Sequence, residues 1–283
     1  MELRLGDSDN KSIWGGAKQN QAPTYTVKSL QTELHAIGVY SDKIDGDFGG
    51  KTEKALKLFQ WCLKNSVHVV KKGSLVVYSS MPSTLITGRC DESTQAKLKS
   101  WVKNQYIVTG DLVRISTTNL SNIELSPNFS LIGQPVVGKS EFVISRTAVP
   151  MIKLMNETAK KLNVIISINQ VLRIFGNKVT GSVVSPATKS QHYIGHAIDC
   201  NIVDGSNWNT ASDFQNQTQT SNADQFISAM KKANYRWGGD FTTVDTPHFD
   251  KELNANTFDY DAEFFLNQKQ ITSGDPIEKL LIP

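Results

Sequence analysis

The sequence is poor in the residue types that build several common kinds of site. Its three cysteines, Cys62, Cys90 and Cys200, form no Cys-x-x-Cys pair, so neither a disulfide framework nor a cysteine-based metal site is expected. No window approaches 18 uncharged apolar residues, so no membrane span is predicted. The N-terminus lacks an apolar core of signal-peptide length. We therefore expect a protein made in the cytoplasm without a standard export signal.

Net charge is also small, at +3, but it is unevenly distributed. Residues 1–107 hold 15 Lys and Arg against 10 Asp and Glu, whereas residues 108–283 hold 15 against 17. The basic N-terminal part favours an acidic polymer as partner, with a chance imbalance on a solvated face as the alternative. The length of 283 residues and the hydrophobic content of 39% predict two domains with real cores.

Residues 1–23 are polar and are predicted to form an N-terminal arm. A domain is predicted over 24–107, because apolar residues recur at helical spacing near 27–37 and 52–59. A third helix is expected over 92–102, with Asp91 as its N-cap. The stretch 67–86 is rich in Val, Ser and Tyr, which indicates a β-hairpin insertion.

This N-terminal stretch resembles the small three-helix peptidoglycan-binding domain found on many wall hydrolases. The resemblance covers residues 24–63 well and 88–103 loosely. The residues that carry it are Val27-Lys28-x-Leu30-Gln31-x-x-Leu34, Gly38, Asp45-Gly46-x-Phe48-Gly49, Thr52-x-x-Ala55 and Phe59-Gln60. It implies peptidoglycan as a partner, although most of these residues are expected to build the core and the turn.

Residues 108–145 are rich in Ser, Asn, Thr and Gly and are predicted to be a linker with short strands. A second domain is predicted over 146–283. It begins with a helical stripe, continues into a buried strand at 164–168, and has another amphipathic helix at 223–233. This mixture indicates an α+β domain, for which we expect a small antiparallel sheet.

Histidine is scarce, with five in the chain, yet three fall in two short blocks of the C-terminal half. One block contains His192, His196 and Asp199, and the other contains Asp245 and His248. Zinc hydrolases use about three His, Asp or Glu ligands with one open position, and a separate carboxylate as general base. A turn leading into a strand would bring His192 and Asp199 together. A lone histidine is more often a hydrogen-bonded structural residue, so spacing alone leaves both interpretations open.

The two blocks resemble the signature of the zinc D-alanyl-D-alanine carboxypeptidases and L-alanyl-D-glutamate endopeptidases, a family that includes phage endolysins. The matching residues are Ser190-x-His192-x-x-Gly195-x-Ala197-x-Asp199, Trp237-Gly238-Gly239-Asp240-Phe241 and Asp245-x-Pro247-His248-Phe249. The resemblance covers about residues 146–250. It implies a zinc peptidase with one zinc ion per chain, held by His192, Asp199 and His248. It also implies that Asp245 is the general base.

The same family uses an arginine to polarise the scissile carbonyl and stabilise the developing oxyanion. Arg173 is the candidate here. The usual Ser-Gly-Tyr-Arg lead-in is absent, because the sequence reads Asn169-Gln170-Val171-Leu172-Arg173. Gln170 therefore remains a rival for this role.

Three further residues have two interpretations each. Ser190 either caps a turn or hydrogen-bonds substrate, and Trp237 either lines the core or binds substrate. Asp240 either orients a metal-binding histidine from outside the ligand set or ends a turn. His196 and Cys200 are expected not to be ligands, since alternation along a strand turns Cys200 away from the site.

Together, the two resemblances imply a monomeric, endolysin-like peptidoglycan hydrolase with no nucleic-acid partner. A wall-binding module raises the effective concentration of a tethered peptidase on an insoluble polymer, and an aspartate base resembles the L-Ala–D-Glu endopeptidase branch. The alternatives are a D,D-carboxypeptidase, an endopeptidase of the D-Ala–diaminopimelate cross-link, and a wall-binding structural protein with an inactive peptidase fold. Action on the wall or in the periplasm then requires holin release or specialised secretion.

Overall fold

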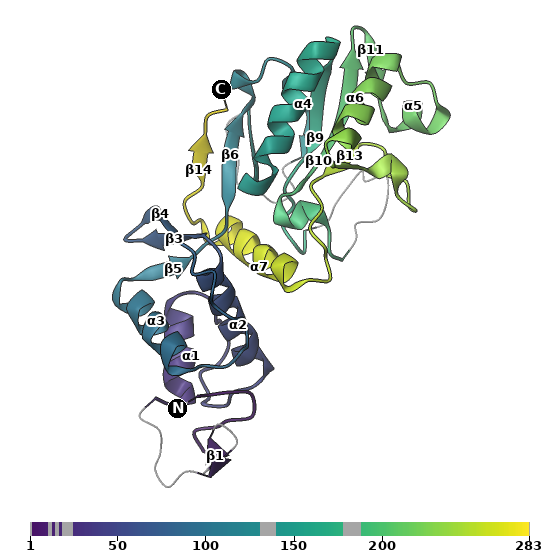
Figure 1. Cartoon of the computed structure of the whole chain (residues 1–283). Coiled ribbons are helices and arrows are strands. Elements are labelled where there is room, and N and C mark those ends of the chain that lie inside the picture. The colour runs from purple at the N-terminus through teal and green to yellow at the C-terminus, as the bar shows by residue number, and fades with distance from the viewer. Residues whose placement is uncertain are drawn as a thin grey trace. The chain divides into compact units, whose positions relative to one another are not determined.

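The chain forms two compact units, Met1–Gly110 and Asp111–Pro283, shown in Figure 1. The computed structural model describes residues 2–10, 13–14, 17–18, 25–130, 140–177 and 188–282. Ten residues of the predicted arm at 1–23 lie outside the described residues. Within the described stretch 2–10, Leu3 is fully buried and pairs with Cys90, and the strands β1 (Ile13–Trp14) and β2 (Ala17–Lys18) pair with each other. No helix in the described part of the chain is long and apolar enough to cross a membrane.

Three helices and a three-stranded antiparallel sheet make up most of the N-terminal unit. The elements are α1 (Val27–Ala36), α2 (Gly50–Lys64), β3 (Val67–Lys71), β4 (Ser74–Tyr78), α3 (Glu92–Lys103) and β5 (Tyr106–Val108). The predicted third helix is present, and the Asp91 side chain accepts a hydrogen bond from the Thr94 amide as an N-cap does. The β3–β4 hairpin lies in the predicted insertion, whereas the pairing of β5 with β3 was not predicted.

Gln31 explains part of the wall-binding motif. Its fully buried amide donates to Asp45 Oδ1 at 2.9 Å and to the Asp47 carbonyl at 3.1 Å, and accepts from the Gly46 amide at 2.9 Å. These bonds hold the turn between α1 and α2 against the core. Gly46 has φ of +83°, a conformation that favours glycine. The motif residues in this turn are therefore scaffold.

The C-terminal unit contains two sheets. The larger has the order β12-β13-β10-β9-β7, with β11 also paired to β10, and the smaller has the order β14-β6-β8. The strands are β6 (Leu112–Ser116), β7 (Ile123–Ser130), β8 (Glu141–Ser145), β9 (Ile165–Gln170), β10 (Ala197–Asp204), β11 (Asn207–Asn209), β12 (Arg236–Trp237), β13 (His248–Asp250) and β14 (Glu278–Leu280).

Both sheets are mixed, because β7 runs parallel to β9 and β14 parallel to β6. The expectation of one small antiparallel sheet was therefore only partly right. The difference arises from residues 108–145, which were predicted to be a linker with short strands. Strands β6, β7 and β8 of this segment belong to the sheets of the unit. The α+β character is as expected.

Two helices pack side by side against the larger sheet, as Figure 1 shows for α4 and α6. The helices and short 3-10 turns of the unit are η1 (Thr117–Asn119), η2 (Arg146–Ala148), α4 (Val149–Leu162), η3 (Gln191–Ile194), α5 (Ala211–Asn216), α6 (Ser221–Lys232), η4 (Gly238–Asp240) and α7 (Phe258–Ser273). Apolar residues of α4, α6, β9 and β10 form one core, and α7 packs on η3. The core thus fixes β10 and its neighbours, which carry the candidate site.

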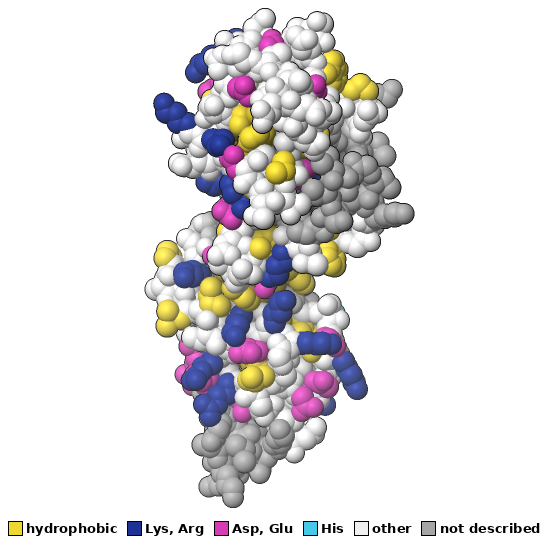
Figure 2. All heavy atoms as spheres, turned by 90° about the vertical axis from the view of Figure 1, so that its right-hand side faces the viewer, with side chains coloured by type: hydrophobic (Ala, Val, Ile, Leu, Met, Phe, Trp, Pro, Cys, Tyr) yellow, Lys and Arg dark blue, Asp and Glu magenta, His cyan; other side chains and the backbone are white. Residues whose placement is uncertain are grey.

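The visible face of the N-terminal unit carries basic and acidic side chains interspersed with one another (Figure 2). Its positive balance is therefore not gathered into a single basic patch on that face. This arrangement gives the drawn surface no strong field of one sign.

Candidate metal centre and active site

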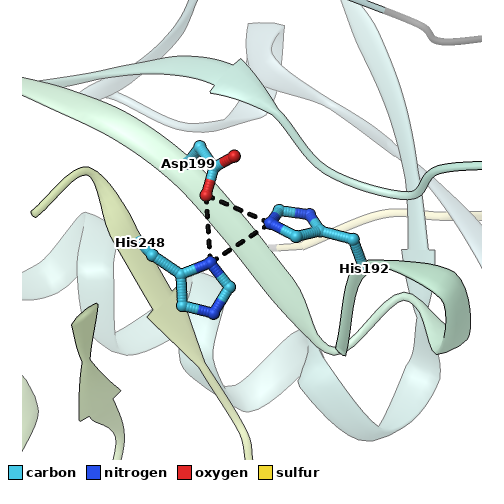
Figure 3. Close-up of side chains that lie close together, drawn as sticks. All are labelled: His192, Asp199 and His248. Atoms are coloured by element: carbon cyan, nitrogen blue, oxygen red, sulfur yellow. Dashed lines mark hydrogen bonds and ion pairs between the residues drawn. The ribbon is translucent and has the colours of Figure 1, made fainter. Parts of the chain in front are cut away.

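His192, Asp199 and His248 converge from three neighbouring segments, η3, β10 and β13 (Figure 3). His192 Nε2 and His248 Nδ1 each lie 3.1 Å from Asp199 Oδ1, and they lie 3.2 Å from each other. The strand register pairs Asp199 directly with His248, so both side chains project from the same face of the sheet. Among the described residues, these three form the one group whose ligand atoms could hold a metal ion.

A left-handed glycine returns the chain from η3 into β10. Gly195 has φ of +72°, and a Cβ at this position would lie 2.7 Å from the backbone nitrogen of Ser145, so no other residue fits without a shift. Ser190 Oγ accepts a hydrogen bond from the His192 amide at 3.3 Å and caps η3. These local features bring His192 back beside Asp199.

Each histidine presents one ring nitrogen to the cluster and uses the other outside it. His192 Nδ1 lies 2.5 Å from the Val171 carbonyl oxygen, and His248 Nε2 lies 3.0 Å from Asp250 Oδ2. Because a carbonyl oxygen can only accept, His192 Nδ1 carries the proton and Nε2 keeps its lone pair. The hydrogen-bond partners therefore select the tautomers that metal binding requires.

Burial and the neighbouring charges shape the protonation of the cluster. Burial lowers the pKa of His192, which favours the neutral ring. Burial opposes ionisation of Asp199, but the two histidines outweigh it and hold the pKa of this carboxyl well below its usual range. Burial also disfavours charge on His248, yet hydrogen bonds to Asp199 and Asp250 raise its pKa to about 9.

This donor set fits a zinc ion. It offers two imidazole nitrogens and one carboxylate oxygen, a combination found in catalytic zinc sites with a position left for water. Cys200 belongs to the apolar core of the unit and is not part of the group. His196 is also separate, because its ring nitrogens face the Lys251 carbonyl at 3.2 Å and Glu263 at 2.8 Å.

Arg173 and Gln170 both lie beside the cluster. Arg173 Nη2 is 2.8 Å from Asp199 Oδ2, and its Nε donates to Gln170 Oε1. Both side chains are buried. The guanidinium therefore contacts Oδ2 of Asp199, whereas both histidines contact Oδ1.

The amide of Gln268 on α7 joins the two segments that carry Arg173 and His192. Its Nε2 donates to the Arg173 carbonyl at 2.9 Å and to the Tyr193 carbonyl at 2.5 Å, and its Oε1 accepts from the Phe175 amide at 2.8 Å. Sequence reasoning missed this residue, because a glutamine in a helix far along the chain carries no local signal of such contacts.

Asp245 is held by a tightly packed loop. Its amide donates to the Gly238 carbonyl at 2.9 Å, and its own carbonyl accepts from the His248 amide at 3.0 Å. A Cβ on Gly238 would overlap the Asp245 carbonyl oxygen and approach His248 Cβ to 2.9 Å. Burial raises the pKa of the Asp245 carboxyl, and the charge of Asp199 adds to this shift.

Trp237 stabilises the same loop. Its indole Nε1 donates to the Thr246 carbonyl at 2.7 Å, and its ring packs against Phe214 at a centroid distance of 5.8 Å. The ring also occupies the space that a side chain at Gly239 would need. The Trp237-Gly238-Gly239 segment therefore packs against the loop that carries Asp245 and holds it in place.

The carboxylate that contacts a candidate ligand is Asp250, which was not singled out from the sequence. Asp240 instead pairs with Lys231 at 2.7 Å and is about half exposed. Asp250 is fully buried and lies two residues after His248 on β13. Alternation along a strand places residues i and i+2 on one face, which is the signal that could have identified it.

Two family models match separate parts of the chain. Residues 184–251 match the family described as D-alanyl-D-alanine carboxypeptidase, and this span contains the whole His-Asp-His cluster and Asp245. Residues 24–63 match the family described as peptidoglycan binding domain. No curated protein matches the chain. Both resemblances in the motifs are thus confirmed by family models, each over part of the chain: a peptidoglycan-binding domain in the N-terminal part and a peptidase domain similar to the D-alanyl-D-alanine carboxypeptidases in the C-terminal part.

Proposed function

We propose that the chain is a zinc-dependent, endolysin-like peptidoglycan hydrolase that cuts stem peptides, most favourably the L-Ala–D-Glu bond. The observation that carries the proposal is the convergence of His192, Asp199 and His248 on one point, inside the span that matches the peptidase family. The ligands in this proposal are His192 Nε2, Asp199 Oδ1 and His248 Nδ1, with one zinc ion per chain.

The chemistry divides among residues of one small region. A zinc ion held by this donor set acidifies water and polarises a carbonyl. The Asp245 carboxylate takes the proton from the attacking water and then delivers it to the departing amine. Burial raises the pKa of this carboxyl above the usual aspartate value, which makes the carboxylate a stronger base toward the attacking water.

The developing oxyanion needs a donor beside the cluster. Arg173 supplies a buried guanidinium there, and Gln170 supplies an amide bonded to the same arginine. We assign the role to Arg173, because a cation stabilises a developing negative charge more strongly than a neutral amide does. Ser190 and Trp237 act on substrate only indirectly, through η3 and the Asp245 loop.

The substrate assignment rests on the pairing of the two domains. A peptidoglycan-binding domain beside a peptidase concentrates the enzyme on an insoluble wall polymer. The site of action in this proposal is the cell wall, reached by holin release or specialised secretion, and the protein works there as a monomer.

A D,D-carboxypeptidase is the second candidate, because the matching family is described by that activity. It would release free D-alanine from stem termini, whereas an L-Ala–D-Glu endopeptidase would release fragments that begin with D-glutamate. A cross-link endopeptidase would instead separate paired stems at the D-Ala–diaminopimelate bond.

Mass spectrometry of fragments from purified peptidoglycan, with and without a chelator, tests the proposal. We expect fragments with a new N-terminal D-glutamate, their loss on chelation and their return on adding zinc. Free D-alanine as the only product would identify the carboxypeptidase. An absence of any product at stoichiometric zinc would instead indicate a wall-binding protein with an inactive peptidase fold.

A further inference from the structure

Asp250 is a fully buried carboxylate for which the proposed reaction gives no role. Its Oδ2 lies 3.0 Å from His248 Nε2, while the other ring nitrogen of His248 faces Asp199 and His192. An isolated buried carboxylate is costly, so its presence beside a candidate ligand calls for both compensation and a role.

Arg236 provides the compensation. It is the cross-strand partner of Asp250 between β12 and β13, and its Nε and Nη2 reach the two carboxylate oxygens at 2.8 Å and 2.6 Å. A bidentate pair of this kind fixes the plane of the carboxylate. The carboxylate therefore meets His248 in one orientation.

Arg236 also acts on the histidine by a second route. Its guanidinium lies 5.0 Å above the ring of Phe241, and that ring lies 5.7 Å from the ring of His248. The imidazole of His248 is thus held at one edge by Asp250 and on its flank by Phe241. Both supports are anchored by one arginine.

The position of Asp250 determines the tautomer of His248. A carboxylate accepts from a proton-bearing nitrogen, so Nε2 carries the proton of the neutral ring, and Nδ1 is then the nitrogen that offers a lone pair toward the cluster. A carboxylate on the far nitrogen also makes an imidazole a stronger metal ligand. His192 has a neutral carbonyl in the same place, that of Val171.

We propose that Asp250, fixed by Arg236, is a positioning residue that orients His248 and holds it in the tautomer that binds the metal ion. The inference rests on the proposed zinc site. Asp250 contacts neither metal nor substrate, so its effect is exerted on the affinity and geometry of the bound ion.

The test measures the zinc dissociation constant of the full chain by competition with a chromophoric chelator, for Asp250→Asn and for Glu252→Gln. Glu252 is the matched control, because it binds the same arginine, at Arg236 Nη1 and 2.6 Å, but from an exposed position. We expect Asp250→Asn to weaken zinc binding about 10- to 100-fold, and Glu252→Gln to leave it unchanged. The absorption spectrum of the Co²⁺-loaded Asp250→Asn variant should also shift.

The double variant Arg236→Gln/Asp250→Asn guards against a folding defect, since it leaves no guanidinium facing the new amide. It should lose the same factor in affinity while its circular dichroism stays that of the wild type. Wild-type affinity in Asp250→Asn would overturn the positioning role and leave the zinc site standing. A wild-type protein that binds no stoichiometric zinc would overturn the proposed function itself, and this inference with it.

Discussion

The two units use the same device to hold their loops but surround it with different chemistry. In the N-terminal unit, the buried amide of Gln31 satisfies backbone groups of the Asp45–Gly49 turn. In the C-terminal unit, the amide of Gln268 does the same for the segments around Arg173 and Tyr193. In the C-terminal unit, however, the nitrogen atoms of two imidazoles and a carboxylate oxygen also gather at one place, where they could hold a metal ion. The amide of Gln31 completes a turn, whereas the amide of Gln268 supports segments that carry a candidate site.

The largest effect should come from removing the proposed base. Asp245→Ala removes a carboxylate but leaves the three proposed ligands, His192, Asp199 and His248, in place. Hydrolysis should therefore fall by about 10²- to 10⁴-fold. Zinc content, measured by atomic emission, should remain at one per chain. Activity that survives this substitution would reassign the base.

A smaller but still large loss of rate should follow from adding a side chain at Gly238, which packs directly against the loop that carries Asp245. Gly238→Ala places a methyl group against the Asp245 carbonyl oxygen, so the loop must move, and a displacement near 1 Å costs about 100-fold in rate. The measurement is the rate of stem-peptide hydrolysis at saturating zinc.

Gly205→Ala is the control for Gly238→Ala. Gly205 also lies in a turn, but a Cβ there meets no atom within 4 Å. Its positive φ of 60° makes the substitution strained locally, without touching the site. Equal losses of rate in the two variants would mean that the close packing at Gly238 does not position Asp245 for catalysis.

The comparison of the two glutamines can be tested directly with one substitution in each unit. Gln31→Met should lower the stability of the N-terminal unit by about 2 kcal/mol, because buried donors and acceptors lose their partner. For a domain of this size that corresponds to a drop in Tm of about 10 °C. Differential scanning calorimetry should show the shift, with hydrolysis of a soluble stem peptide unchanged.

Gln268→Met should show the reverse selectivity. Zinc affinity and soluble-peptide hydrolysis should both decrease, since the segments of Arg173 and His192 lose their common anchor. The calorimetric transition of the N-terminal unit should stay where it is. If Gln31→Met instead weakened zinc binding, the division between scaffold and site would be wrong.

The smallest expected effect is a pH-dependent change in the Tm of the metal-free protein, caused by the Asp245 carboxyl. Burial raises the pKa of Asp245, so at neutral pH the ionised carboxylate disfavours the folded, metal-free protein. Asp245→Asn should therefore raise the Tm of the metal-free chain at pH 7. The gain should disappear as the pH falls below about 4, where the carboxyl is protonated in both folded and unfolded states. A gain that persisted in acid would point to a cause other than charge.

Local patterns predicted most of the longer helices, but neither α5 nor the 16-residue α7 was predicted. Apolar residues at helical spacing marked α1, α2 and α4, and Asp91 marked the start of α3. The pairing of β5 with β3, and of β7 with β9, joins segments that are distant in sequence. Neither the period nor the turn residues of a single strand identify its partner, so these sheets could not be predicted.

Within the candidate site, too, residues in a local motif could be predicted, whereas residues that act through contacts distant in sequence could not. His192, Asp199, Asp245 and His248 lie in two short blocks whose spacing resembles a family signature, and the structure brings the three proposed ligands together. Gln268 became visible only through its contacts, which cross from α7 to η3. The motif identifies the proposed ligands, whereas the residues that hold them in place are recognised only from packing in the folded chain.

The direct pairing of Asp199 with His248 has a consequence for how the domain can be altered. Their separation is set by the ladder between β10 and β13, so it does not depend on how much chain runs from one strand to the other. The β10–β11 turn at Gly205, where the backbone is open, could accept an inserted loop without changing the distance between the two side chains. The domain thus offers a grafting point at which reach toward the polymer can be re-engineered apart from the metal site.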